Sequence, residues 1–171
     1  SNQVWKKLIL SVIHSIQKKY NVKISADIVV GGNIPIGCGL SSSTAFTISI
    51  TQAILNLYKF NLNKKELADF CHKIENAALN MASGLLDQYA IIMSRVNKTL
   101  IIDFLSNSFD YCSINIPSCS WVIINSRVNR RLSNTKYMER VRECNRALEI
   151  IKDNYKIFKE IKNGRTIFKI C

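Results

Sequence analysis

A turn rich in glycine and serine, within residues 31–45, has the residue types best suited to chemistry. Glycine lets a backbone approach a ligand closely, and a helix N-terminus presents unpaired N–H groups with partial positive charge. Because the turn opens into an apolar segment of helical period, the two features predict an anion site, with phosphate as the usual occupant. Serine hydroxyls in such a turn can bond phosphate oxygens or reach a metal ion. The candidate phosphate-binding residues are Gly37, Cys38, Gly39, Leu40, Ser41, Ser42 and Ser43.

This turn matches neither of the two common nucleotide-binding motifs. A Walker A loop ends its glycine run in a lysine, and no lysine follows Gly39 here. The dinucleotide fingerprint needs a third glycine, which is missing after Gly37-x-Gly39. A nucleotide bound at this turn would therefore be held in another way, and a plain serine N-cap remains the structural alternative.

Two carboxylates stand among apolar residues of predicted helices. Asp87 lies in a first helical turn, where it fits either a helix-dipole partner or a general base or metal ligand facing the glycine turn. Glu75, taken alone, fits the surface of an amphipathic helix, and Tyr137 fits a packing position on another. The local pattern leaves these three positions unconnected in space.

The elements that must position these residues follow from apolar periodicity. Helical spacing predicts helices over residues 3–20, 42–58, 63–81, 85–93 and from 136 onward. Alternating or β-branched runs predict strands at 22–30, 99–103, 111–116 and 121–125, the last of them buried. Residues 127–135 are polar and predict a loop. The fold class is α+β, with strands before and after a central group of helices.

The composition is that of an ordinary globular protein. With 171 residues, the chain fits one domain, or one domain and part of another. No apolar run reaches the roughly 18 residues of a membrane span, and no signal-peptide pattern opens the sequence. The 6 cysteines form no C-x-x-C pairs, and 2 histidines give a zinc site little to recruit. Scattered cysteines of this kind are typical of reduced thiols, so we expect a cytoplasmic protein.

The net charge of +12 raises the question of nucleic-acid binding. The basic residues beyond position 127, however, alternate with glutamates at helical spacing, which is typical of a solvated helix face. We therefore expect small-molecule ligands, no nucleic-acid or membrane partner, and a monomer.

Several motifs resemble those of the GHMP small-molecule kinases, and within them the galactokinase family. The glycine turn resembles the ATP-binding motif of the superfamily, and the similarity runs from about Val4 to Ile151 in the family's order and approximate spacing. The matching stretches are Pro35-x-Gly37-x-Gly39-Leu40-Ser41-Ser42-Ser43-x-Ala45, Gly84-Leu85-Leu86-Asp87-Gln88, Leu100-Ile101-Ile102-Asp103, Val122-Ile123-Ile124-Asn125-Ser126 and Tyr137-x-x-Arg140-x-x-x-Cys144.

This resemblance implies a galactokinase, which uses ATP and Mg²⁺ to phosphorylate galactose at its anomeric C1 hydroxyl and so forms galactose 1-phosphate in galactose metabolism. By analogy, Asp87 would be the catalytic base, and Ser43 and Glu75 would hold Mg²⁺ against the ATP phosphates. Residues 37–43 would wrap the triphosphate, while Gly84, Asp87 and Tyr137 would contact the sugar.

The resemblance also implies the domain organisation. Residues 1–126 would form part of the GHMP-kinase N-terminal, ATP-binding domain, which is ribosomal protein S5 domain 2-like. Residues 127–171 would begin the C-terminal domain. We expect both domains to be incomplete within this chain.

Some family motifs are absent from the chain. The Gly-Arg-x-Asn-Leu-Ile-Gly-Glu-His-x-Asp-Tyr motif, which supplies a transition-state arginine and sugar contacts, does not occur, nor does the later glycine-rich segment. We therefore expect the 171-residue chain alone to have no kinase activity. The run from Asn76 to Ser83 also differs from the family's cysteine-containing run, which leaves the exact sugar open.

Three alternative functions remain open. A sibling kinase for N-acetylgalactosamine is the first, although Tyr137 favours galactose. A non-catalytic galactose sensor is the second, although the intact run from Ser41 to Ala45 argues against it. The third is a remnant that leaves a hydrophobic face exposed where further strands should pack.

Overall fold

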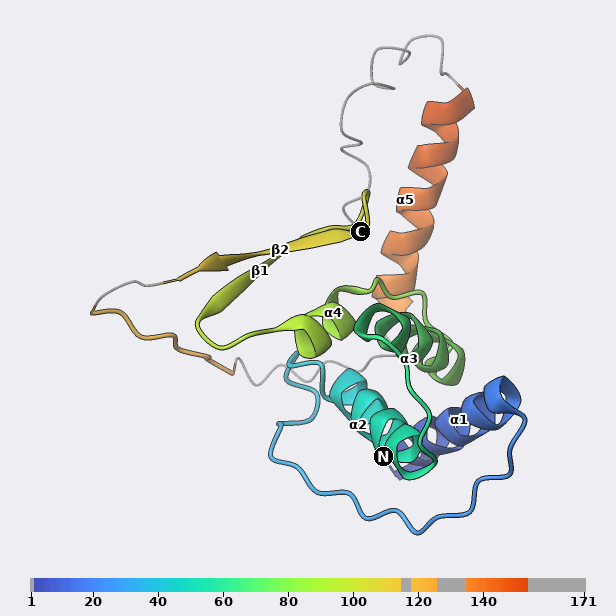
Figure 1. The fold of residues 1–171 in the computed structure, drawn as a ribbon. Coiled ribbons are helices and arrows are strands. Elements are labelled where there is room, and N and C mark those ends of the chain that lie inside the picture. The colour runs from blue at the N-terminus through green and yellow to red at the C-terminus, as the bar shows by residue number, and fades with distance from the viewer. Residues whose placement is uncertain (1, 115–117, 126–134, 154–171) are drawn as a thin grey trace.

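The computed structural model describes residues 2–114, 118–125 and 135–153. In these ranges the chain forms five helices and one antiparallel pair of strands (Figure 1). Their bounds, in chain order, are α1 (Asn2–Tyr20), α2 (Ser42–Leu57), α3 (Lys64–Leu79), α4 (Leu86–Met93), β1 (Lys98–Asp103), β2 (Ser108–Ser113) and α5 (Thr135–Asp153).

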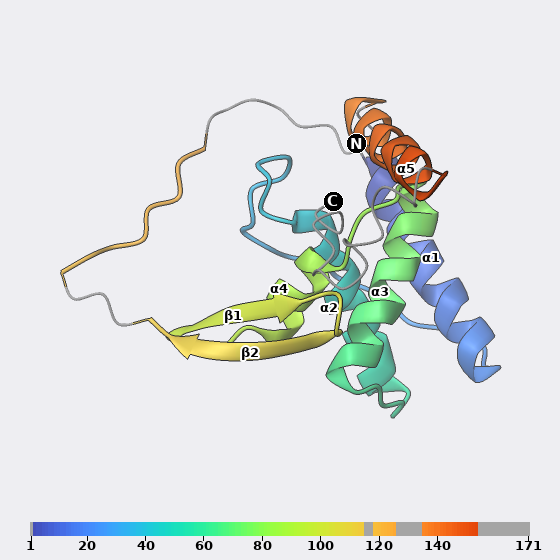
Figure 2. The ribbon, with the colours of Figure 1, turned by 90° about the horizontal axis from the view of Figure 1, so that it is seen from above.

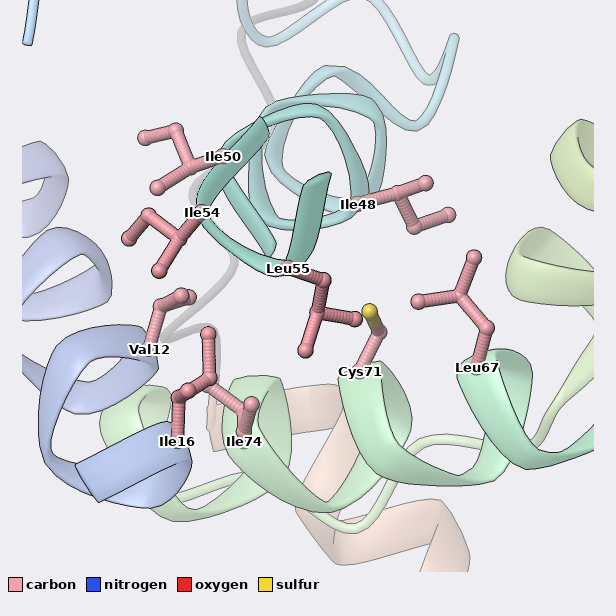
Figure 3. Packing of buried hydrophobic residues seen from close by; sticks show 9 residues of the cluster. All are labelled: Val12, Ile16, Ile48, Ile50, Ile54, Leu55, Leu67, Cys71 and Ile74. Atoms are coloured by element: carbon pink, nitrogen blue, oxygen red, sulfur yellow. The ribbon is translucent and has the colours of Figure 1, made fainter. Parts of the chain in front are cut away.

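The main core lies where α1, α2 and α3 pack against one another. Each helix contributes an apolar stripe at helical spacing, and these stripes meet in one cluster (Figure 3). Because the stripes are recorded locally in the sequence, the periodicity predicts this part of the fold well. The buried members of the cluster are Val12, Ile16, Ile48, Ile50, Ile54, Leu55, Leu67, Cys71 and Ile74.

A second, smaller cluster attaches α4 and the β-hairpin to α3. Tyr89 and Met93 of α4 are buried against Ala68 of α3 and against apolar side chains of the hairpin. Two tyrosines fix the hairpin in place, since the Tyr89 hydroxyl donates to Asn107 Oδ1 at 2.8 Å and the Tyr111 hydroxyl donates to the Met93 carbonyl at 2.5 Å. Helix α4 is thereby held between the helical core and the hairpin, as the view from above shows (Figure 2).

The predicted helices are confirmed to within a few residues. Asn63 starts α3 as its N-cap and forms a reciprocal capping box with Glu66, in which the Asn63 side chain accepts from the Glu66 N–H and the Glu66 carboxylate accepts from the Asn63 N–H. Helix α4 begins at Leu86, one residue later than predicted. Of the predicted C-terminal helix, residues 135–153 are described and form α5, and the part beyond 153 lies outside the described residues.

The prediction of a strand at residues 22–30 is wrong. These residues form a long, open connection between α1 and α2 (Figure 1), in which Val29 is 97% exposed. Ile24 and Ile28 do pack against the core, so part of the alternating apolar pattern is buried as the sequence predicts. A strand also needs a neighbour for its backbone, and here the N–H and carbonyl of Ser25 bond the hydroxyl of Tyr58 instead.

The prediction of a buried strand at residues 121–125 is also wrong. Trp121 and Ile124 are 84% and 85% exposed, and the segment pairs with no strand in the described part of the chain. An apolar β-branched run favours a strand only where another strand accepts its hydrogen bonds.

The second hairpin strand is shifted relative to its prediction at 111–116. The register pairs Asp103 with Ser108, so β2 begins three residues earlier. The Asp103 carboxylate stabilises the turn between β1 and β2, because it accepts from the Leu105 N–H at 2.8 Å and from the Ser106 hydroxyl. Residues 115–117 lie outside the described residues.

Candidate active site

The glycine turn ends at the N-terminus of α2, as the sequence predicts. Ser41 occupies the N-cap position, but its side chain makes no capping hydrogen bond. The carbonyl of Ser41 accepts the first helical bond, from the Ala45 N–H at 2.9 Å. The amides of the first helical turn are therefore not satisfied by a serine cap, which weakens the N-cap alternative and leaves these donors for an anion.

The backbone of the turn adopts a conformation that requires glycine. Gly37 and Gly39 both have a φ of 76°, in the left-handed region that a side chain disfavours. Ser41 also lies in the left-handed region, with φ 53° and ψ 37°, at a cost of about 1–2 kcal/mol for a residue with a Cβ. Strain of this kind is common in segments that hold ligands. The turn therefore keeps a backbone conformation that is costly for Ser41 and accessible to Gly37 and Gly39.

Glu75 connects three helices through its carboxylate. Its Oε2 accepts a hydrogen bond from the Thr44 hydroxyl of α2 at 2.8 Å and another from the Gln88 amide of α4 at 3.0 Å. The side chain of Glu75 is only 4% exposed. The prediction that this residue, taken alone, lies on the surface of an amphipathic helix is therefore wrong, because the apolar stripe of α3 includes it.

No cation among the described residues pairs with the Glu75 carboxylate. Both of its described donors are neutral, and no lysine or arginine of the described residues forms an ion pair with it. A buried carboxylate is costly unless a positive charge lies nearby. Ser43, which precedes Thr44 in the chain and is 5% exposed in the first turn of α2, offers a hydroxyl. One carboxylate and one hydroxyl, completed by substrate phosphates, fit the way proteins usually hold Mg²⁺.

Asp87 and Gly84 are brought near this group by the start of α4. Asp87 precedes Gln88, whose side chain reaches Glu75, and it lies exposed in the first turn of α4. Helix α4 in turn packs against α2 and α3 (Figure 1). Gly84 is exposed just before that turn, and a Cβ added to it would meet no atom within 4 Å. Both residues are thus exposed, at the start of the helix whose Gln88 bonds the buried Glu75.

Tyr137 is not connected to the site by the structure. It falls within α5, but its side chain lies outside the described residues. At the other end of the glycine turn, the Asn125 side-chain amide donates to Cys38 Sγ at 3.1 Å. Thr44 and Gln88 were not singled out by sequence reasoning, since only the fold reveals that both bond Glu75.

Cys71 lies one helical turn before Glu75 and is fully buried. Burial, together with the Glu75 carboxylate, raises the pKa of the Cys71 thiol to about 12. A thiol with such a pKa stays protonated near neutral pH and is a poor nucleophile. Among the described residues, the cysteines are free thiols and no three His, Cys, Asp or Glu side chains cluster as a metal site. No described helix has the length and apolar character to cross a membrane.

Comparison with known proteins places this geometry in a family. Residues 7–95, more than half of the chain, match the profile of the GHMP kinases N terminal domain. The matched range includes the glycine turn, Glu75 and Asp87.

Curated relatives and a solved structure agree with this family match. A galactokinase from Thermosipho africanus is 32% identical over 171 residues, covering 96% of this chain and 48% of the relative. A galactokinase from Clostridium perfringens is 32% identical over 80% of this chain and 35% of its own length. The crystal structure of Lactococcus lactis galactokinase complexed with galactose superposes with a TM-score of 0.81 at 26% identity, over 90% of this chain and 40% of that one. The chain thus spans about a third to a half of these proteins.

Proposed function

The chain belongs to the GHMP kinase family, and from this membership we propose that the protein that carries it is a galactokinase. The reaction is the transfer of the γ-phosphoryl group of Mg-ATP to the C1 hydroxyl of galactose, which yields galactose 1-phosphate and ADP. The 171-residue chain contributes the phosphate turn and the base, and by itself we expect it to be inactive. The galactokinase relatives and the galactose-bound structural neighbour support the choice of sugar.

One observation carries the proposal: a single buried carboxylate joins the phosphate turn to the candidate base. Glu75 bonds Thr44, which follows Ser43, and Gln88, which follows Asp87. Phosphoryl transfer depends mainly on positioning and on charge stabilisation, so a rigid link between the ATP site and the sugar site is what the reaction needs.

Each residue then has a defined task. The N–H groups at the start of α2, with residues 37–43, would bind the triphosphate, and Ser43 and Glu75 would hold a Mg²⁺ ion, which would supply positive charge against the phosphates. Asp87 accepts the proton of the C1 hydroxyl while the sugar oxygen bonds the γ-phosphorus and the bond from that phosphorus to ADP breaks. Gly84 leaves room for the sugar, and Tyr137 lines the sugar from the C-terminal domain.

The domain division and the location belong to the same proposal. Residues 1–126 form part of the ATP-binding domain, and residues 127–171 begin the C-terminal domain, so the sugar site lies between the two. The free thiols among the described cysteines support a reducing compartment, the cytoplasm.

The experiment that tests the function uses the full-length protein that carries this chain. Purified protein is incubated with Mg-ATP and, separately, with galactose, N-acetylgalactosamine or glucose, and products are followed by ³¹P NMR. We expect galactose 1-phosphate. Product from N-acetylgalactosamine alone would identify the sibling kinase, and galactose binding without any product would identify a sensor. Either result would overturn the proposal.

A further inference from the structure

The turn between α3 and α4 is anchored to α3 by one asparagine. The Asn76 Oδ1 accepts two hydrogen bonds from Ser83, from its N–H at 3.1 Å and from its hydroxyl at 2.7 Å. Asn76 lies within α3 and is half-buried, seven residues before Ser83. Sequence reasoning did not single out this residue, because its partner is fixed by the path of the turn and by no local pattern.

His72 completes the anchor from the preceding helical turn of α3. Its Nε2 lies 2.7 Å from the carbonyl oxygen of Ser83, and the Asn76 side-chain nitrogen lies 3.4 Å from the same oxygen. With a proton on Nε2 the ring donates to this carbonyl, and without one Nε2 accepts from the Asn76 side-chain nitrogen, which lies 2.9 Å away. The backbone N–H, the backbone carbonyl and the hydroxyl of Ser83 are thus all bonded to α3.

This anchor lies immediately before the proposed sugar-binding residues. Ser83 precedes Gly84, and Asp87 follows in the first turn of α4. At the far end of the same stretch, Gln88 bonds Glu75. Two consecutive residues of α3, Glu75 and Asn76, therefore hold the two ends of the segment that carries Gly84 and Asp87.

We propose that Asn76 is a positioning residue for the reaction, because its bonds to Ser83 set where Gly84 and Asp87 stand relative to the phosphate turn. Asn76 touches neither substrate and acts through Ser83. The reaction in this inference rests on the proposed function, whereas the hydrogen bonds between Asn76 and Ser83 come from the structure alone. A displacement of about 1 Å in such a segment is enough to lower catalysis strongly.

The test compares three variants of the full-length protein. Asn76→Ala removes the acceptor while keeping a residue that suits a helix. Asn76→Asp keeps an oxygen that can accept both bonds from Ser83. Asn56→Ala, at an exposed position of α2, is the matched control. Steady-state kinetics are measured with galactose and ATP varied in turn, and amide hydrogen exchange is followed by mass spectrometry over residues 80–90.

We expect Asn76→Ala to lower kcat/KM for galactose at least about tenfold, through both kcat and KM, with KM for ATP unchanged. Exchange should become faster at residues 83–87 and stay the same in α1 and α2. Asn76→Asp should recover most of the activity, and Asn56→Ala should behave as wild type.

Two results would overturn the positioning role. One is an Asn76→Ala variant with wild-type exchange and wild-type galactose kinetics. The other is an equal loss toward galactose and ATP that Asn76→Asp does not recover, which is the result of a merely structural role. If the wild type phosphorylates another sugar, the galactose assignment alone fails, and the same comparison with that sugar decides the role of Asn76.

Discussion

At the scale of single residues, Glu75 carries the most information about the site. Its carboxylate is buried, it accepts bonds from two other helices, and no cation of the described residues pairs with it. Removal from water penalises an unbalanced charge, which is why we propose Glu75 as a residue that holds Mg²⁺.

The metal-binding role of Glu75 predicts the effect of Glu75→Gln in the full-length protein. The glutamine oxygen can still accept from Thr44 and Gln88, so the fold should be retained, but the negative charge is lost. We expect kcat to fall at least about a hundredfold, the scale of losing one transition-state electrostatic contact, and half-maximal activity to require more Mg²⁺. Turnover measured across a Mg²⁺ titration checks this.

The control for that titration is Glu139→Gln, which removes an exposed carboxylate of α5. It should leave both kcat and the Mg²⁺ dependence unchanged. A Glu75→Gln variant with the Mg²⁺ dependence of wild type would exclude Glu75 as a metal-binding residue.

A substitution at Gly84 distinguishes a role of this residue in sugar binding from a role in folding. Because an added Cβ meets no protein atom within 4 Å, Gly84→Ala should leave the melting temperature unchanged. If the open space holds the sugar, KM for galactose should rise several-fold while KM for ATP stays constant. Calorimetric melting and kinetics with each substrate varied provide the measurement, and an unchanged galactose KM would remove Gly84 from the sugar site.

At the scale of elements, the sequence predicted the helices correctly but also predicted two strands that do not form. A helix satisfies its backbone within itself, so the stripe of Leu67, Cys71 and Ile74 and the cap at Asn63 determine α3 from local sequence. A strand needs a partner that may lie far away in sequence. Residues 22–30 and 121–125 have strand composition, yet neither has a neighbouring strand within the described ranges.

The packing of α2 on α3 predicts an alkaline limit to stability. Burial raises the pKa of Cys71 from its ordinary value of 9.0 to about 12, so the folded state retains the thiol proton that the unfolded state releases. This contribution is complete below pH 9 and is lost as the pH rises toward 12. Urea unfolding of wild type and Cys71→Ala across that range should give a free-energy difference that shrinks with pH.

A free-energy difference that stays constant from pH 9 to pH 12 would contradict the raised pKa. Cys112→Ala serves as the control, because Cys112 is exposed on β2. Its difference from wild type should not vary with pH beyond the error of the measurement.

At the scale of the whole molecule, large apolar side chains are exposed among the described residues. A groove of about 630 Å³ lies between α1, α2 and the connection at residues 28–36, and Trp5 and Phe46 line it. Val122 and Ile123 are about three-quarters exposed on the other open segment, at 75% and 76%.

This exposure predicts different environments for the two tryptophans. Trp121 is 84% exposed, whereas Trp5 is half-buried with its ring 4.7 Å from that of Phe46. In the isolated chain, a Trp5→Phe variant should therefore emit at longer wavelength and be quenched more strongly by acrylamide than a Trp121→Phe variant. Stronger quenching of Trp5 would contradict the exposure of residues 121–125.

The candidate site was predictable in its parts and unpredictable in its assembly. Gly37, Gly39 and the serines predict a phosphate turn from composition alone, and the left-handed backbone at both glycines agrees with the local residue types. The burial of Glu75 and the anchor at Asn76 depend on how α2, α3 and α4 meet, and no local pattern records that.

The most direct test of the central claim is the Asp87→Asn variant of the full-length protein, assayed for ATP binding and for galactose 1-phosphate formation. The amide keeps the shape of the side chain but cannot take the C1 proton, and general-base catalysis contributes about 10²–10⁴-fold. We predict that turnover falls at least about a hundredfold while ATP affinity stays at the wild-type value. Asp110→Asn on β2 is the control, and it should leave both turnover and ATP affinity unchanged. Wild-type turnover by Asp87→Asn would contradict the assignment of the base and, with it, the account of the site.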